Sequence, residues 1–201
     1  MPISRPRALL RLLAYAALTL PLMPVQALLV AAGSPLAARL PRWYHAACCR
    51  ILGLSVLVRG APSTTAPTLF VSNHVSYLDI VVLSALAPVS FVAKREVASW
   101  PFFGWLARLQ RTVFVGRDRR NVHDERDSLA AALAEGHSLV LFPEATSWDG
   151  SRLRPFRSSL LAAAEIAPDG RPLAVQPVTI AYTRLDGTPM GRHLRPFFAW
   201  Y

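Results

Sequence analysis

Short apolar runs recur along most of the chain, and Gly, Pro and polar turns separate them. Brief runs of this kind predict strands, and the longer segments between them predict helices. We expect strands at 54–59, 68–72, 89–93, 112–115, 138–142 and 174–182. We expect helices at 79–87, 122–135 and 157–167, because Pro88, Gly136 and Pro168 mark their ends.

Strands that alternate with helices predict an α/β fold with a mostly parallel mixed sheet flanked by helices. In such a sheet the functional residues collect where strands give way to loops. The composition changes after Pro62, and an uncharged stretch occupies the amino-terminal part. We therefore expect a membrane-anchoring helical segment at 1–50 and a globular domain at 51–201.

The amino-terminal segment carries no charge from residue 12 to residue 32. A helix of that length is long enough to cross the hydrocarbon core of a bilayer. Pro21 and Pro24 interrupt the helical hydrogen bonds, so a kinked span or a hairpin dipping in from the cytoplasm fits as well as a straight helix. A cleaved secretory signal with its site at 25–27 is the alternative. We expect a retained anchor, because the apolar run continues past that site.

The charge and hydropathy of the chain narrow the choice of partner. The chain has 201 residues and a net charge of +10, which predicts an anionic partner: nucleic acid, a membrane surface or a phosphorylated substrate. The mean hydropathy of +0.32 favours the membrane. Dispersed arginines and the lack of a recognition motif disfavour a nucleic-acid binder. Four aromatic residues lie close together in the sequence: Trp100, Phe102, Phe103 and Trp105. They either lie at the membrane interface or pack in the core.

The two cysteines, Cys48 and Cys49, are adjacent in sequence and do not form an ordinary structural bridge. Together with His45 they lack the spacing of a metal site, so we expect no metal. Phosphate-loop, dinucleotide and nucleophile-elbow motifs do not occur in the sequence. A nucleotide-driven enzyme and a serine hydrolase of the common fold are therefore disfavoured.

The strongest candidate for chemistry is His74 with Asp79, between an expected strand and an expected helix. Five residues rotate a helix by about 500°, so the two side chains meet only if His74 curls over the first helical turn. The carboxylate would then hold one imidazole nitrogen and leave the other to accept a proton as a general base. A capping box with Ser76 as N-cap is the structural alternative, and the two interpretations are compatible.

Three further segments follow expected strands. Gly116 and Arg117, with two more arginines nearby, fit either a phosphate clamp or a solvated helix start. Glu144 is a single acid at the mouth of a turn, and residues 175–180 form a strand that contains a proline.

Taken together and in this order, the four segments resemble the blocks of the glycerolipid acyltransferase family, which includes 1-acylglycerol-3-phosphate acyltransferases. Asn73, His74 and Asp79 match its NHxxxxD motif, residues 114–117 match its arginine-bearing block, and residues 142–146 match its FPEGT block. Residues 175–180 look like its fourth block, so the resemblance covers roughly 68–182. Ala145 stands where the family usually has glycine, and Ser147 where it often has a basic residue. The run after Ala145 is more similar to a bacterial subgroup that includes lyso-ornithine-lipid acyltransferases.

The resemblance implies transfer of a fatty acyl group from acyl-CoA or acyl carrier protein to a lysolipid hydroxyl. It implies His74 as general base and Asp79 as the group that orients it, with the thioester as co-substrate and no other cofactor. It implies substrate binding by Asn73, Lys94, Arg117, Glu144 and Thr146. We expect 1-acylglycerol-3-phosphate as the acceptor, with lyso-ornithine lipid as the alternative. We expect the bacterial inner membrane, with the site facing the cytoplasm, and a non-catalytic membrane protein is a further alternative.

Overall fold

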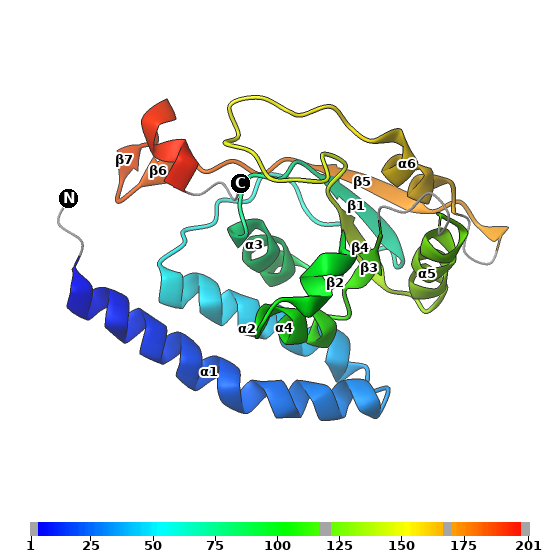
Figure 1. The fold of residues 1–201 in the computed structure, drawn as a ribbon, viewed down its shortest axis with the longest axis horizontal. Helices are drawn as coiled ribbons and strands as arrows, with labels where there is room; N and C mark the ends of the chain where they lie inside the picture. Colours follow the sequence, from blue (N-terminus) through cyan, green and yellow to red (C-terminus); the bar gives the residue numbers. More distant parts are fainter. Residues whose placement is uncertain (1–3, 117–121, 167–169, 198–201) are drawn as a thin grey trace.

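A computed structural model describes residues 4–116, 122–166 and 170–197, and its centre is a five-stranded sheet (Figure 1). The strand order is β3-β2-β4-β1-β5, and every neighbouring pair in this sheet is parallel. The strands are β1 (Thr68–Ser72), β2 (Val89–Lys94), β3 (Val113–Val115), β4 (Ser138–Leu141) and β5 (Ala174–Val178). The predicted α/β fold is confirmed, and the sheet is wholly parallel rather than mixed.

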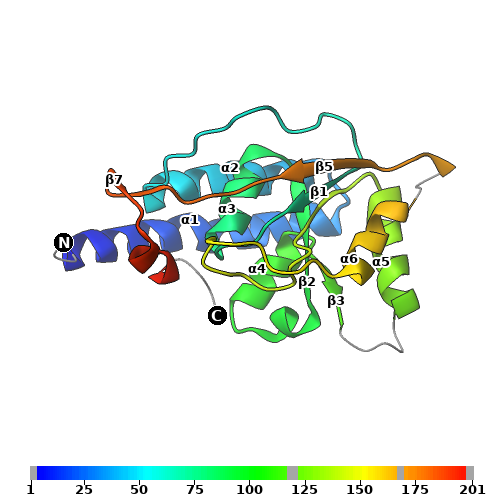
Figure 2. The ribbon, with the colours of Figure 1, turned by 90° about the horizontal axis from the view of Figure 1, so that it is seen from above.

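Helices cover both faces of this sheet because successive strand residues alternate between two cores. Leu139 and Leu141 belong to one core, which α5 (Val122–Ala134) and the short turns α6 (Ser158–Leu161) and η3 (Ala162–Glu165) cover (Figure 2). Val140 and Phe142 belong to the other core, which α3 (Leu78–Leu86) covers.

The amino-terminal segment forms two long helices, α1 (Arg5–Ala31) and α2 (Leu36–Leu52), which run in opposite directions (Figure 1). Gly33 permits the tight turn between them, because its φ of 60° is rarely open to other residues. Helix α2 packs on α3, and α1 packs on α2 and on α4 (Phe103–Leu109). Helix α1 continues through both of its prolines, Pro21 and Pro24. The amino-terminal segment is therefore a helical hairpin whose first helix is continuous through the prolines.

Two polar residues of α1, Thr19 and Gln26, are buried against the protein, and most of its leucines are exposed. Thr19 is buried, and its hydroxyl lies 2.9 Å from the Tyr44 hydroxyl of α2. The Gln26 amide donates hydrogen bonds to the carbonyl oxygens of Ala37 and Leu109. The exposed apolar side chains of α1 are Leu9, Leu10, Leu12, Leu13, Leu20, Val25, Leu28 and Val30.

Three sequence predictions about the elements are wrong. Residues 54–59 form no strand, and Leu57 there is 82% exposed, because this segment crosses the surface without a strand beside it. Strand β5 ends at Val178 rather than at 182, because the backbone of Ile180 pairs with a side chain of the first motif. The helix expected at 157–167 is divided into α6 and η3.

Several small elements were not predicted from the sequence. A 3-10 turn, η1 (Arg95–Ser99), precedes α4. Past β5 the chain forms a two-stranded antiparallel hairpin of β6 (Arg184–Leu185) and β7 (Thr188–Pro189), followed by η5 (Arg192–Phe197).

Candidate active site

The sequence motifs meet at the carboxyl edge of the sheet. His74 follows β1, Glu144 follows β4, and the chain after β5 passes beside the first motif. Strand β1 lies between β4 and β5, so motifs that are far apart in sequence become neighbours. This is the edge at which open α/β sheets bind their ligands.

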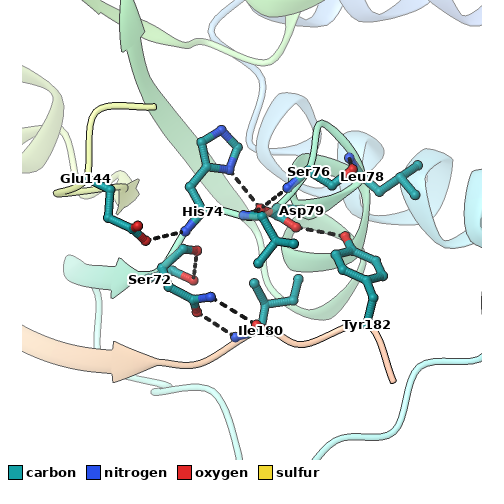
Figure 3. Close-up of polar contacts among 10 residues, drawn as sticks. Ser72, His74, Ser76, Leu78, Asp79, Glu144, Ile180 and Tyr182 are labelled. Carbon is teal, nitrogen blue, oxygen red and sulfur yellow. Dashed lines mark hydrogen bonds and ion pairs between the residues drawn. The ribbon is translucent and has the colours of Figure 1, made fainter. Parts of the chain in front are cut away.

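His74 and Asp79 are in contact, as their spacing allowed if His74 lay in the loop before the helix (Figure 3). The His74 Nδ1 atom lies 2.7 Å from Asp79 Oδ2. A carboxylate can only accept, so Nδ1 carries the proton and the lone pair lies on Nε2. Among the described residues Nε2 has no hydrogen-bond partner, and the His74 side chain is 20% exposed. This geometry permits Nε2 to accept a proton from a bound ligand.

Stacking fixes the plane of the imidazole ring. The Phe142 ring lies parallel to it, with the ring centroids 4.1 Å apart. Phe142 belongs to the core between the sheet and α3, so the ring that supports His74 is itself held by packing. The histidine is therefore oriented by Asp79 at one edge and by Phe142 at one face.

Asp79 is fully buried in the first turn of α3 and also holds the loop before it. Its Oδ2 atom accepts hydrogen bonds from the backbone N–H groups of Val75 and Ser76, at 2.7 and 3.0 Å. The Ser76 hydroxyl in turn accepts from the backbone N–H of Leu78. Both interpretations of the motif are therefore realised, because one carboxylate orients His74 and also caps the helix start.

Tyr182 is a contact of the site that the sequence analysis missed. Its hydroxyl lies 2.7 Å from Asp79 Oδ1, the carboxylate oxygen that His74 does not use (Figure 3). Burial raises the pKa of Tyr182 above its ordinary value, and the negative charge of Asp79 raises it further. The sequence placed Tyr182 inside a strand, and no local pattern marks a tyrosine there as a partner of the first motif.

Glu144 has a buried carboxylate that joins two loops. Its Oε1 atom accepts from the backbone N–H of His74 at 2.9 Å, and its Oε2 atom accepts from that of Arg154 at 2.8 Å. The residue after it, Ala145, has a φ of 57°, in the left-handed region that glycine adopts without strain. The backbone conformation therefore explains why glycine is expected at this position.

Asn73 brings the segment after β5 against the first motif. Its side-chain amide donates to the carbonyl oxygen of Ile180 at 3.0 Å, and its Oδ1 atom accepts from the Ile180 N–H at 2.8 Å. This double hydrogen bond continues the pairing of β1 with β5 by means of a side chain. It also places Tyr182, two residues further on, beside Asp79.

The remaining predicted site residues are Lys94, Thr146 and Arg117. Lys94 ends β2, two strands away from β1 and therefore about 10 Å along the sheet. Thr146 is half-buried in the loop after β4. Arg117 lies outside the described residues.

Described residues line two cavities, and no predicted site residue is among the lining residues of either. The larger, of about 410 Å³, lies between α1 and α4, and its lining includes Met23 and Trp105. The smaller, of about 210 Å³, has Tyr182, Asp149 and Arg195 in its walls. Among the described residues no group of His, Cys, Asp and Glu side chains is arranged to hold a metal ion. His45 instead bonds through Nδ1 to the Ser84 hydroxyl.

The parallel sheet, with a histidine and a buried aspartate at its carboxyl edge, has the architecture of an enzyme. A sequence model of the acyltransferase family matches residues 55–181, more than half of the chain. The chain therefore belongs to the acyltransferase family.

Relatives of the chain agree with this assignment. The chain is 45% identical to the lyso-ornithine lipid O-acyltransferase of Brucella abortus over 199 residues, which cover 96% of this chain and 74% of that protein. Three further proteins of that name are 42–46% identical, and the chain spans 54–64% of their length. The 1-acyl-sn-glycerol-3-phosphate acyltransferase of Neisseria gonorrhoeae is 39% identical over 56% of this chain and 44% of its own length.

A solved structure supports the fold. The crystal structure of the 1-acyl-sn-glycerophosphate acyltransferase PlsC from Thermotoga maritima matches 71% of this chain and 65% of its own, with a TM-score of 0.52. The identity is 23%, so this likeness concerns the fold alone.

Proposed function

We propose that the chain transfers a fatty acyl group from a thioester to the hydroxyl of a lysolipid, and that the lysolipid is a lyso-ornithine lipid. The sequence motifs favour 1-acylglycerol-3-phosphate as the acceptor, with lyso-ornithine lipid as the alternative. The relatives favour the alternative, because those named for lyso-ornithine lipid match at higher identity and over more of the chain. The departures at Ala145 and Ser147 agree with this choice.

The observation that supports the proposed chemistry is the hydrogen bonding of the His74 ring. Its Nδ1 proton is engaged by a fully buried carboxylate, which leaves Nε2 as the basic atom. Nε2 would remove the proton from the acceptor hydroxyl as its oxygen attacks the thioester carbonyl carbon. The carbon–sulfur bond then breaks, and the thiolate takes up the proton that His74 holds. General-base assistance of this kind is typically worth about 10²- to 10⁴-fold in rate.

The thiol product explains why one base suffices. A thiol has a pKa near 8.5, by reference to cysteine, so the departing sulfur needs little help from an acid. Asp79 would stabilise the imidazolium that forms while the proton is on His74. The proposed reaction uses acyl-CoA or acyl carrier protein as co-substrate.

The acceptor head group is proposed to lie along the carboxyl edge, between His74 and the ends of β2 and β3. Lys94 and Arg117 would supply positive charge there, and Thr146 a hydroxyl. A lyso-ornithine lipid has a carboxylate rather than a phosphate, and arginine binds both groups in a bidentate way. Glu144 would position the head group indirectly, because its carboxylate holds together the two loops that it joins.

We further propose that the α1–α2 hairpin holds the enzyme at the inner membrane, with the site facing the cytoplasm. Helix α1 is long and apolar enough to cross a membrane, and only 11% of its most apolar window is buried in the protein. Both substrates have acyl chains, whose transfer into lipid is worth about 0.8 kcal/mol per methylene. The aromatic group near α4 is also exposed, with Trp105 at 63% and Phe103 at 57%, which favours the membrane interface for it.

The test is acyl transfer by membranes that contain the chain, with lyso-ornithine lipid and 1-acylglycerol-3-phosphate offered in parallel. We expect product from lyso-ornithine lipid, and its loss by at least 10²-fold in His74→Ala. His193→Ala is the matched control, because His193 is exposed on η5. Product from 1-acylglycerol-3-phosphate only would overturn the acceptor, and full activity of His74→Ala would overturn the base.

A further inference from the structure

Tyr182 belongs to the same hydrogen-bond chain as the proposed base. Its hydroxyl binds Asp79 Oδ1, while His74 Nδ1 binds Asp79 Oδ2. The three side chains form one line from the cavity wall to the imidazole (Figure 3). None of the four sequence motifs includes Tyr182.

The direction of the hydrogen bond follows from chemistry. An ionised carboxylate can only accept, so the phenol donates. Asp79 has no exposed surface, and within the described chain its Oδ1 atom has Tyr182 as its donor. A buried oxygen that loses its donor is left without a partner, which is costly in a low-dielectric interior.

We propose that Tyr182 is a positioning residue: its hydroxyl draws charge from Asp79 and thereby sets the pH at which the His74–Asp79 pair takes up a proton. This inference rests on the proposed role of His74 as the base. A donor on a carboxylate favours the charged form, so the pair holds a proton less tightly while Tyr182 is present. Because His74 and Asp79 titrate together, Tyr182 lowers the proton affinity of the pair whichever of the two carries the proton.

Other ionisable groups surround the pair. Glu144 binds the backbone N–H of His74, Cys49 of α2 and Tyr77 act on Tyr182 through charge, and Asp149 and Arg195 face the cavity that Tyr182 lines. Removing only the Tyr182 hydroxyl leaves all five of these ionisable groups in place. A change in titration then reports on that hydroxyl.

The first experiment compares Tyr182→Phe with the wild type. We expect kcat to fall about tenfold, because a hydrogen bond to a charged group is lost, with little change in KM for the lysolipid. We expect the acid limb of the kcat/KM profile to move to higher pH. Tyr44→Phe is the matched control, since it removes a part-buried phenol that bonds Thr19 in α1. It should leave the profile unchanged.

The second experiment keeps the side chain in place. 3-Fluorotyrosine at position 182 preserves the shape and is a stronger donor, so the acid limb should move to lower pH. In both variants the His74 imidazole is titrated by NMR of ¹⁵N-histidine-labelled enzyme in detergent, and His74→Ala assigns its resonance. This readout needs no acceptor lipid, so a failed acyl-transfer assay with shifted titrations would count against the proposed function only. Titrations that coincide with the wild type in both variants would overturn the role of Tyr182.

Discussion

The carboxyl edge of the sheet and helix α1 distribute their polar groups in the same way, but their surroundings differ. At the sheet edge, Asp79 and Glu144 are buried and bonded, while the His74 ring is partly open. In α1, Thr19 and Gln26 turn inward and leucines turn outward. In both regions buried polar side chains form hydrogen bonds within the protein, although the Oε1 atom of Gln26 has no partner among the described residues.

The difference lies in what each region leaves exposed. The sheet edge exposes a basic nitrogen, which suits a polar ligand. Helix α1 exposes leucines along most of its length, which water disfavours and lipid accepts. A lipid-modifying enzyme needs both surfaces, because its acceptor has a polar head group and an apolar chain.

The largest expected effect is at helix α1, on the face that exposes leucines. Leu13→Asp with Leu20→Asp places two charges on the exposed face of α1, where the side chains are 57% and 58% exposed. Each charge at the centre of a membrane helix costs about 3 kcal/mol. Vesicle flotation should show loss of membrane binding with the fold retained by circular dichroism.

Leu153→Asp is the control for that experiment, because Leu153 is 63% exposed in the loop after β4. It should float like the wild type. Equal flotation of all three proteins would show that α1 does not hold the enzyme at the membrane.

An intermediate effect is expected at the polar edge. Asn73→Ala removes two hydrogen bonds to the Ile180 backbone, which should lower the free energy of unfolding by about 2 kcal/mol. It should also lower kcat, because Tyr182 follows Ile180. Thermal unfolding in detergent and the acyl-transfer assay measure the two effects.

Gln176→Ala is the matched control for Asn73→Ala. The Gln176 amide makes a similar double contact, accepting from the Ser63 N–H and donating to the Ala61 carbonyl oxygen. Gln176→Ala should lower the free energy of unfolding by a similar amount and leave kcat unchanged. If both variants lower kcat alike, the Asn73 contact has no special link to the site.

The smallest effect is expected at Ala145, whose φ of 57° is unfavourable for a residue with a Cβ atom. Ala145→Gly should raise the free energy of unfolding by about 1 kcal/mol. Ala131→Gly, on the exposed face of α5, should lower it by about 1 kcal/mol. Opposite shifts in thermal unfolding support the strain at Ala145, and a loss of stability in both would contradict it.

Much of the fold could be predicted from the sequence because local patterns set it. Strands β1 to β4 lie within one or two residues of their predicted bounds, and α3 and α5 do so as well. The spacing of His74 and Asp79 left their pairing open beside a capping box, and the structure shows the pairing. The strand expected at 54–59 failed, because an apolar run forms a strand only where a neighbouring strand is available.

The sequence by itself determined four of the five strands of the central sheet and which helix is apolar enough for a membrane, and it offered Asp79 as a partner for His74. Only the tertiary structure decided that Tyr182 binds Asp79, that Glu144 joins two loops, and that α1 buries Thr19 and Gln26. Tyr182 and Asp79 are 103 positions apart, and they meet because β5 pairs with β1. Local periodicity has no information about such a contact, which depends on the order of strands in the sheet.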